Sequence, residues 1–101
     1  MTKVLNLLGL ARRAGKLVTG EELVIKAVQE KSCALVFLAS DASENLKKKL
    51  TDKTTSYGVT LRLDYTADEL SQAIGTNRKV LAVCDLGFAK TMMENLPHAL
   101  S

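Results

Sequence analysis

The sequence is poor in the residues that build covalent or catalytic chemistry. It contains two cysteines, one histidine, one proline and no tryptophan. Because Cys33 and Cys84 lie far apart and each borders an apolar run, buried reduced thiols are expected rather than a disulfide or a metal site. His98 stands in a C-terminal tail that is expected to fray. A Ser-His or Cys-His catalytic pair that included it would therefore lack structural support. CxxC, HExxH, Walker and GxGxxG motifs are missing as well. The sequence therefore predicts no enzyme and no cofactor.

Long apolar runs are also missing. No window approaches the roughly 18 uninterrupted apolar residues of a membrane span, and the apolar run near the N-terminus is too short and amphipathic for a signal peptide. We therefore expect a soluble, cytoplasmic protein that does not bind a membrane. With 101 residues, 47% of them hydrophobic, the chain can bury a hydrophobic core without stabilisation by disulfides or a bound metal. A single domain over residues 1–101 is predicted, without linkers or repeats.

The positive charge is modest in total but unevenly distributed. The net charge is +3, and the first 26 residues carry five basic side chains against two acidic ones. Such an excess permits a polyanionic partner without requiring one. A second basic run, residues 47–49, points in several directions around a predicted helix and is expected to be a solvated face.

The first third of the sequence predicts two helices joined by a short extended piece. Apolar residues from Val4 to Ala11 repeat at helical spacing, and Gly15 follows as a left-handed stop. After the extended residues 16–19, Thr19 and Glu22 fit a capping box, so a second helix is expected from Gly20. Its apolar face is predicted to consist of Leu23, Val24, Ala27 and Val28. Lys26 is predicted to point outward and to form a pair with Glu22.

The remainder alternates apolar runs with capped helical segments. The runs at residues 34–39, 59–63 and 80–84 are predicted to be strands. Between them, one helix is expected from Ser40 or Asp41 to Gly58, and a second is expected after a capping box at Thr66. The buried stripe of the first of these helices is predicted to contain Ala42, Leu46, Leu50 and Tyr57. A last helix is expected to be capped by Asp85 and ended by Pro97.

This order of elements indicates an α/β fold, a three-layer α-β-α sandwich around a roughly four-stranded mixed sheet. Ligands of such folds meet strand ends and helix starts, which makes residues 19–22, 40–43 and 85–87 candidates. Asp41 and Asp85 each follow a buried strand, and paired carboxylates there could hold magnesium or accept a phosphoryl group. Both are also explained as helix caps.

Four segments, "AGKLVTGEELVIKAV", "ALVFLASDAS", "YTADELSQAIG" and "VLAVCDLGFAK", occur in an order and spacing that resembles a known superfamily. It is the kink-turn RNA-binding ribosomal protein superfamily named for L7Ae and L30e, and the short bacterial YlxQ-type branch is the most similar. The resemblance covers residues 4–91. It implies an α-β-α sandwich whose second helix enters RNA at tandem sheared G·A pairs. It also implies that the loop before the last helix packs apolar groups on an extruded base.

Carried over to this sequence, the resemblance implies an RNA-facing edge at the second helix. Gly20 and Lys26 match the pattern, whereas Glu22 stands where asparagine is expected and Leu23 where glutamate or glutamine is expected. The implied RNA-binding residues are Lys16, Thr19, Gly20, Glu21, Glu22 and Lys26, with Asp85, Leu86 and Gly87 from the other loop.

The implied function is that of a non-enzymatic protein that binds kink-turn or internal-loop RNA, with ribosomal RNA as the candidate target and no small-molecule substrate. The alternative is a protein-interaction module of the same fold that has lost RNA readout, because neither carboxylate nor leucine can donate to a base edge.

Overall fold

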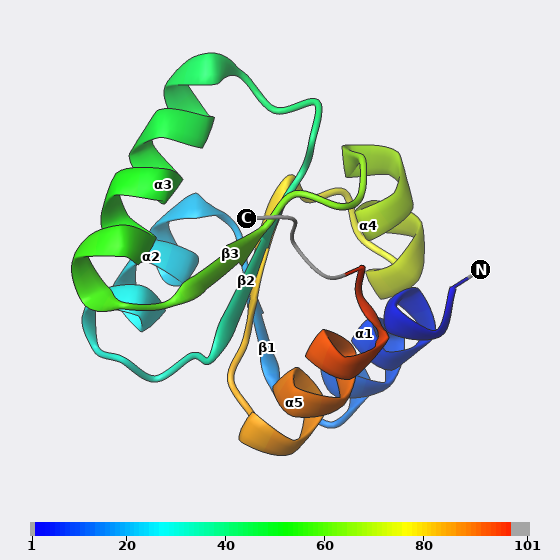
Figure 1. Cartoon of the computed structure of the whole chain (residues 1–101). Coiled ribbons are helices and arrows are strands. Elements are labelled where there is room, and N and C mark those ends of the chain that lie inside the picture. The colour runs from blue at the N-terminus through cyan, green and yellow to red at the C-terminus, as the bar shows by residue number, and fades with distance from the viewer. Residues whose placement is uncertain (1, 98–101) are drawn as a thin grey trace.

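Helices and strands alternate along residues 2–97, the part of the chain that the computed structural model describes (Figure 1). The helices are α1 (Lys3–Arg13), α2 (Glu21–Gln29), α3 (Glu44–Tyr57), α4 (Ala67–Ile74) and α5 (Leu86–Asn95). The strands are β1 (Leu17–Thr19), β2 (Leu35–Leu38), β3 (Thr60–Arg62) and β4 (Val80–Val83). The order of elements is the one predicted from the sequence. The tail predicted to fray, with His98, lies outside the described residues.

The four strands form one sheet in the order β1-β4-β2-β3. β2 and β3 are parallel, whereas β4 is antiparallel to both of its neighbours, β1 and β2. The predicted mixed sheet is therefore confirmed. Because β4 runs the opposite way, its start lies beside the ends of β1 and β2, and its end lies beside their starts. We call these the α2 end of the sheet, where β1 leads into α2, and the α5 end, where β4 leads into α5.

Helices cover both faces of the sheet. α2 and α3 lie on one face, and α1, α4 and α5 lie on the other, which gives the predicted three layers (Figure 1). All four residues of β2 and of β4 are buried, as expected for central strands covered on both sides. Among residues 2–97, no helix has both the length and the apolar character that a membrane crossing requires.

Several predicted helix ends are confirmed by hydrogen bonds. The Thr66 hydroxyl accepts from the Glu69 amide at 3.2 Å, and the Glu69 carboxylate accepts from the Thr66 amide at 2.9 Å, which completes a capping box. The Asp85 carboxylate accepts from the Phe88 amide at 2.8 Å and so caps α5. The glycines predicted to stop helices have positive φ angles: Gly15, Gly58 and Gly75.

The predicted capping box at Thr19 is wrong. Helix α2 begins at Glu21, and its N-cap residue is Gly20, which has no side chain to accept a hydrogen bond. Thr19 is instead the last residue of β1, where it pairs with Leu81 of β4. With Gly20 as the N-cap, Glu22 is the second helical residue rather than the third that a capping box requires. Strand pairing has therefore moved the helix start by one residue.

The predicted start of α3 is also wrong. Ser43, not Ser40 or Asp41, is the N-cap, and its hydroxyl accepts from the Leu46 amide at 3.2 Å. The Asp41 carboxylate accepts from the Ala67 amide at 2.9 Å, at the start of α4. Asp41 thus satisfies an unpaired donor of a helix that lies 26 residues further along the chain.

Two residues predicted to face the core are exposed. Leu23 is 56% exposed and Tyr57 is 36% exposed. In α2 the buried positions are Val24, Ala27 and Val28, a narrower face than predicted. In α3 the core position near the C-terminus is Thr54, whose hydroxyl donates to the Leu50 carbonyl at 2.8 Å. A hydroxyl that bonds to the preceding turn can be buried without an unsatisfied polar group.

Candidate functional site

The start of α2 is fixed against the start of β4 by Gly20. The Gly20 amide donates to the Val80 carbonyl at 3.0 Å, and the residue has φ +92° and ψ 150°. Residues with a side chain rarely adopt this conformation, so glycine allows the chain to turn directly from β1 into α2. The surface is also open at this point, because a Cβ atom built on Gly20 would meet no atom within 4 Å.

No side chain among residues 2–97 caps α2. The amide groups of its first turn, at Glu21, Glu22 and Leu23, therefore have no capping acceptor. Free amides and the positive end of the helix dipole together favour an anion at this position. The capping box predicted from the sequence would have satisfied one of these donors, the Glu22 amide, through the Thr19 hydroxyl.

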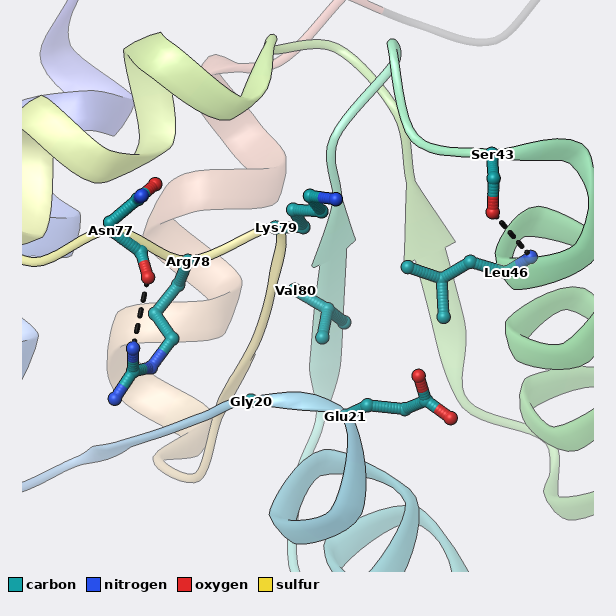
Figure 2. A pocket seen from close by; sticks show the side chains of 8 residues that line it. All are labelled: Gly20, Glu21, Ser43, Leu46, Asn77, Arg78, Lys79 and Val80. Carbon is teal, nitrogen blue, oxygen red and sulfur yellow. Dashed lines mark hydrogen bonds between the residues drawn. The ribbon is translucent and has the colours of Figure 1, made fainter.

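The loop between α4 and β4 meets the start of α2 at the α2 end of the sheet. Within this loop, the Arg78 guanidinium donates to the Thr19 hydroxyl at 3.2 Å through Nε and to the Asn77 carbonyl at 2.9 Å through Nη1. The Arg78 amide donates to the Ser71 hydroxyl at 3.0 Å, which ties the loop to α4. Figure 2 shows Arg78 on one side of Gly20 and Glu21 on the other. An exposed arginine is thus held beside an uncapped helix start.

Two hollows open at this edge. The larger has a volume of about 460 Å³ and is lined by Gly20, Glu21, Ser43, Leu46, Asn77, Arg78, Lys79 and Val80 (Figure 2). The second has a volume of about 340 Å³ and is lined by Thr19, Gly20, Glu21, Glu22, Leu23 and Arg78. Both share Gly20 and Arg78, so the start of α2 and the α4–β4 loop form one continuous surface. We call this surface the α2 edge and include Lys26 in it, one turn along α2.

The charges of the α2 edge are only partly balanced. Glu21 forms an ion pair with Lys49 of α3 at 2.5 Å, which offsets one carboxylate at the helix start. The predicted pair between Glu22 and Lys26 does not form, and both side chains are exposed. Arg78 and Lys79 add two exposed cations from a distant part of the sequence. The exposed charge available to a ligand is therefore predominantly positive.

The residues predicted to bind RNA divide between the two ends of the sheet. Thr19, Gly20, Glu21 and Glu22 lie together at the α2 end, with Lys26 nearby on α2. Asp85, Leu86 and Gly87 follow β4 at the α5 end, and Lys16 precedes β1 there, where its carbonyl accepts from the Cys84 amide at 2.8 Å. Because β1 and β4 are antiparallel, the structure does not bring the two groups together.

Sequence reasoning missed the polar residues that the α4–β4 loop contributes to the α2 edge, which are Asn77, Arg78 and Lys79. In the sequence, these three residues form a polar, basic stretch between the helix-stopping Gly75 and a buried strand. Such a stretch is typical of any exposed loop, so on its own it did not single out a site.

The alternative acid pocket is contradicted by the topology. Asp41 follows β2 and Asp85 follows β4, and these two strands are antiparallel, so the carboxylates lie at opposite ends of the sheet. Each accepts a hydrogen bond at a helix start, from Ala67 and Phe88 respectively. Residues 2–97 also hold no group of three or more histidine, cysteine or acidic side chains that could bind a metal.

The two cysteines are free, as predicted. Burial and, to a smaller extent, the neighbouring Cys84 together raise the pKa of the Cys33 thiol to about 11. Burial likewise raises the pKa of Cys84, which is only partly exposed. Both thiols are therefore protonated at neutral pH, whereas the thiolate is the form that reacts as a nucleophile or binds metal.

Comparison with known proteins gives a consistent result. Residues 2–92 match the ribosomal protein L7Ae/L30e/S12e/Gadd45 family. The chain belongs to this family. Among curated members, it is 49% identical over 92 residues to the RNA-binding protein YlxQ of Enterococcus faecium, covering 91% of this chain and 89% of that protein. It is 45% identical over 91 residues to the YlxQ protein of Bacillus subtilis, covering 89% and 91%. The resemblance to the YlxQ branch is thus confirmed, and neither curated name is that of an enzyme.

Two solved structures share the fold of this chain. A Bacillus halodurans protein of unknown function superposes with a TM-score of 0.89 at 45% identity, covering 93% of this chain and 96% of that one. The 15.5 kD RNA binding protein of Giardia lamblia superposes with a TM-score of 0.77 at 19% identity, covering 90% and 79%. At that identity the second likeness concerns the fold alone.

Proposed function

We propose that this protein is a non-enzymatic RNA-binding protein that uses the α2 edge to recognise bent, internally looped RNA of the kink-turn type. The observation that carries the proposal is Arg78, an exposed guanidinium held by Thr19 and Asn77 beside the uncapped start of α2. The names of the two curated relatives, both RNA-binding proteins, support the choice of RNA as the ligand.

The chemistry of the α2 edge suits the RNA backbone. The amides at the helix start can donate to a phosphate, and Gly20 allows close approach because it has no side chain. Arg78 can bind a phosphate through two donors, and Lys26 and Lys79 add positive charge. Glu22 and Leu23 offer no donor to a base edge. We therefore propose that shape and backbone contacts, rather than base hydrogen bonds from these two side chains, provide recognition.

The RNA contacts predicted at Lys16, Asp85, Leu86 and Gly87 remain a prediction. Their position at the α5 end leaves them outside the α2 edge, so we do not include them in the proposed RNA surface.

We propose ribosomal RNA as the target and the cytoplasm as the location. Cosedimentation of the tagged protein with ribosomes, before and after RNase treatment, tests both points.

A protein-interaction module that has lost RNA readout is the second candidate. It is favoured by one observation, the exposed Leu23 next to Glu22, where the family pattern has glutamate or glutamine next to asparagine. The two candidates differ in their salt dependence, because contacts with phosphates release counterions and contacts between apolar side chains do not.

The experiment is a gel-shift panel of kink-turn, internal-loop and plain duplex RNA at two salt concentrations. We expect the kink-turn RNA to bind best, with an affinity that falls steeply as salt rises. Arg78→Gln should weaken this binding about tenfold, and Arg13→Gln, an exposed arginine at the far end of α1, is the matched control. Equal binding to all three RNAs, or equal loss in both variants, would contradict the proposal. No binding at micromolar protein would favour the interaction module.

A further inference from the structure

The α5 end of the sheet carries the most exposed large apolar side chain of the described residues. Leu86, the first residue of α5, is 78% exposed, and Leu10 of α1 is 49% exposed. A hollow of about 400 Å³ between α1 and α5 is lined by Leu7, Asp85, Gly87, Phe88 and Thr91. A second hollow of about 220 Å³ is lined by Lys31, Ser32, Cys33, Ala34, Cys84, Asp85 and Leu86. Leu86 thus projects beside concave surface.

The apolar side chains here form a patch rather than isolated residues. Leu7 and Leu10 are three residues apart on α1 and so share one face of that helix. Leu7 and Phe88, both only partly buried, line the same hollow, which joins this face to the start of α5. Contiguous exposed apolar surface is typical of contacts with another macromolecule, whereas single exposed leucines are ordinary.

Unpaired cations lie at or near the same end of the sheet as this patch. Four exposed cations at or near this end form no ion pair with another residue between 2 and 97, namely Arg13, Lys16, Lys31 and Lys90. Lys31 lines a hollow together with Leu86, and Lys90 lies one helical turn after Leu86 on the same face of α5. Of the nearby acids, Asp85 is already engaged as the cap of α5, and Glu30 is exposed. The rim of the patch therefore has a net positive charge.

We propose that this surface docks an acidic protein segment that packs apolar side chains against Leu86 and the hollow between α1 and α5. The four cations would pair with its carboxylates. An apolar centre with a charged rim is the usual arrangement of a protein interface. A phosphate backbone fits less well, because the Asp85 carboxylate caps α5 and places a negative charge at the start of this helix. We call this the α5 surface.

The α5 surface and the α2 edge lie at opposite ends of the sheet, since one follows the end of β4 and the other precedes its start. An occupant of one therefore leaves the other accessible. The protein would then connect a structured RNA to an acidic protein partner.

The test places the photo-crosslinking residue p-benzoylphenylalanine at position 86 of the full chain in cells. Crosslinked peptides are then sequenced, and each captured segment is synthesised and titrated against the purified protein. The proposal requires segments with an excess of acidic residues and exposed apolar side chains. Crosslinks only to RNA, only to a second copy of this chain, or to segments without an acidic excess would overturn it, and so would the absence of a crosslink.

Two matched variants complete the test. Leu86→Glu should weaken binding of the captured segment at least about tenfold, because a leucine that the segment would cover is replaced by a charge that repels the partner's carboxylates. Leu23→Glu places the same change on the exposed leucine of the α2 edge and should leave segment binding unaltered. Kink-turn RNA binding should show the reverse pattern. If Leu86→Glu weakens RNA binding and spares the segment, the sequence-based assignment of Leu86 to RNA is right and the present proposal is wrong.

Discussion

The conformation of Gly20 can be tested by the single substitution Gly20→Ala. A Cβ atom at Gly20 would meet nothing within 4 Å, so steric overlap with other residues contributes nothing to the cost. The cost must come from the backbone, because φ +92° with ψ 150° is a region that only glycine populates freely. We expect a loss of about 2–3 kcal/mol in the free energy of unfolding. For a domain of this size, that corresponds to a fall of about 8–24 °C in Tm.

Gly15→Ala is the matched control, since a Cβ atom there also meets nothing within 4 Å but φ is +72°, in the ordinary left-handed region. We expect it to cost about 1–2 kcal/mol. Thermal and urea unfolding measure both changes, and RNA titration of the folded variants completes the comparison. Gly20→Ala should weaken RNA binding more than Gly15→Ala, because only the first lies on the α2 edge. A Tm that falls by less than about 4 °C in Gly20→Ala would refute the reasoning about the backbone.

Three further predictions follow from individual contacts. Thr66→Ala should lose about 0.5–2 kcal/mol with its capping box, whereas Thr19→Ala should lose less, because the Thr19 hydroxyl accepts only from an exposed arginine; urea unfolding compares them. Lys26→Ala should weaken RNA binding by about 1 kcal/mol and leave Tm unchanged, and an unaltered affinity would remove Lys26 from the α2 edge. Because folding raises the pKa of Cys33 from 9.0 to about 11, its contribution to stability is full below pH 9 and is lost as pH rises towards 11. Urea unfolding across this range should therefore show a smaller decline in Cys33→Ala than in the parent protein.

The sequence alone determined which segments become helices and strands. Continuous apolar runs could be stable only as covered strands, and β2 and β4 are the two central strands of the sheet. The capping box at Thr66 and the cap at Asp85 were readable because their donors and acceptors lie within three residues. These features depend on local hydrogen bonds and on the spacing of apolar residues, so their information is contained in short stretches of chain.

Only the tertiary structure decided which of these segments share a surface. Arg78 donates to Thr19, 59 residues earlier, because β4 pairs with β1. The same antiparallel pairing carries Asp85 and Leu86 to the other end of the sheet and moves the cap of α2 from Thr19 to Gly20. Apolar periodicity shows that a strand is buried but not in which direction it runs, because both directions bury the same side chains. The direction of β4 was therefore settled by packing of the whole chain, and it determined the composition of the candidate site.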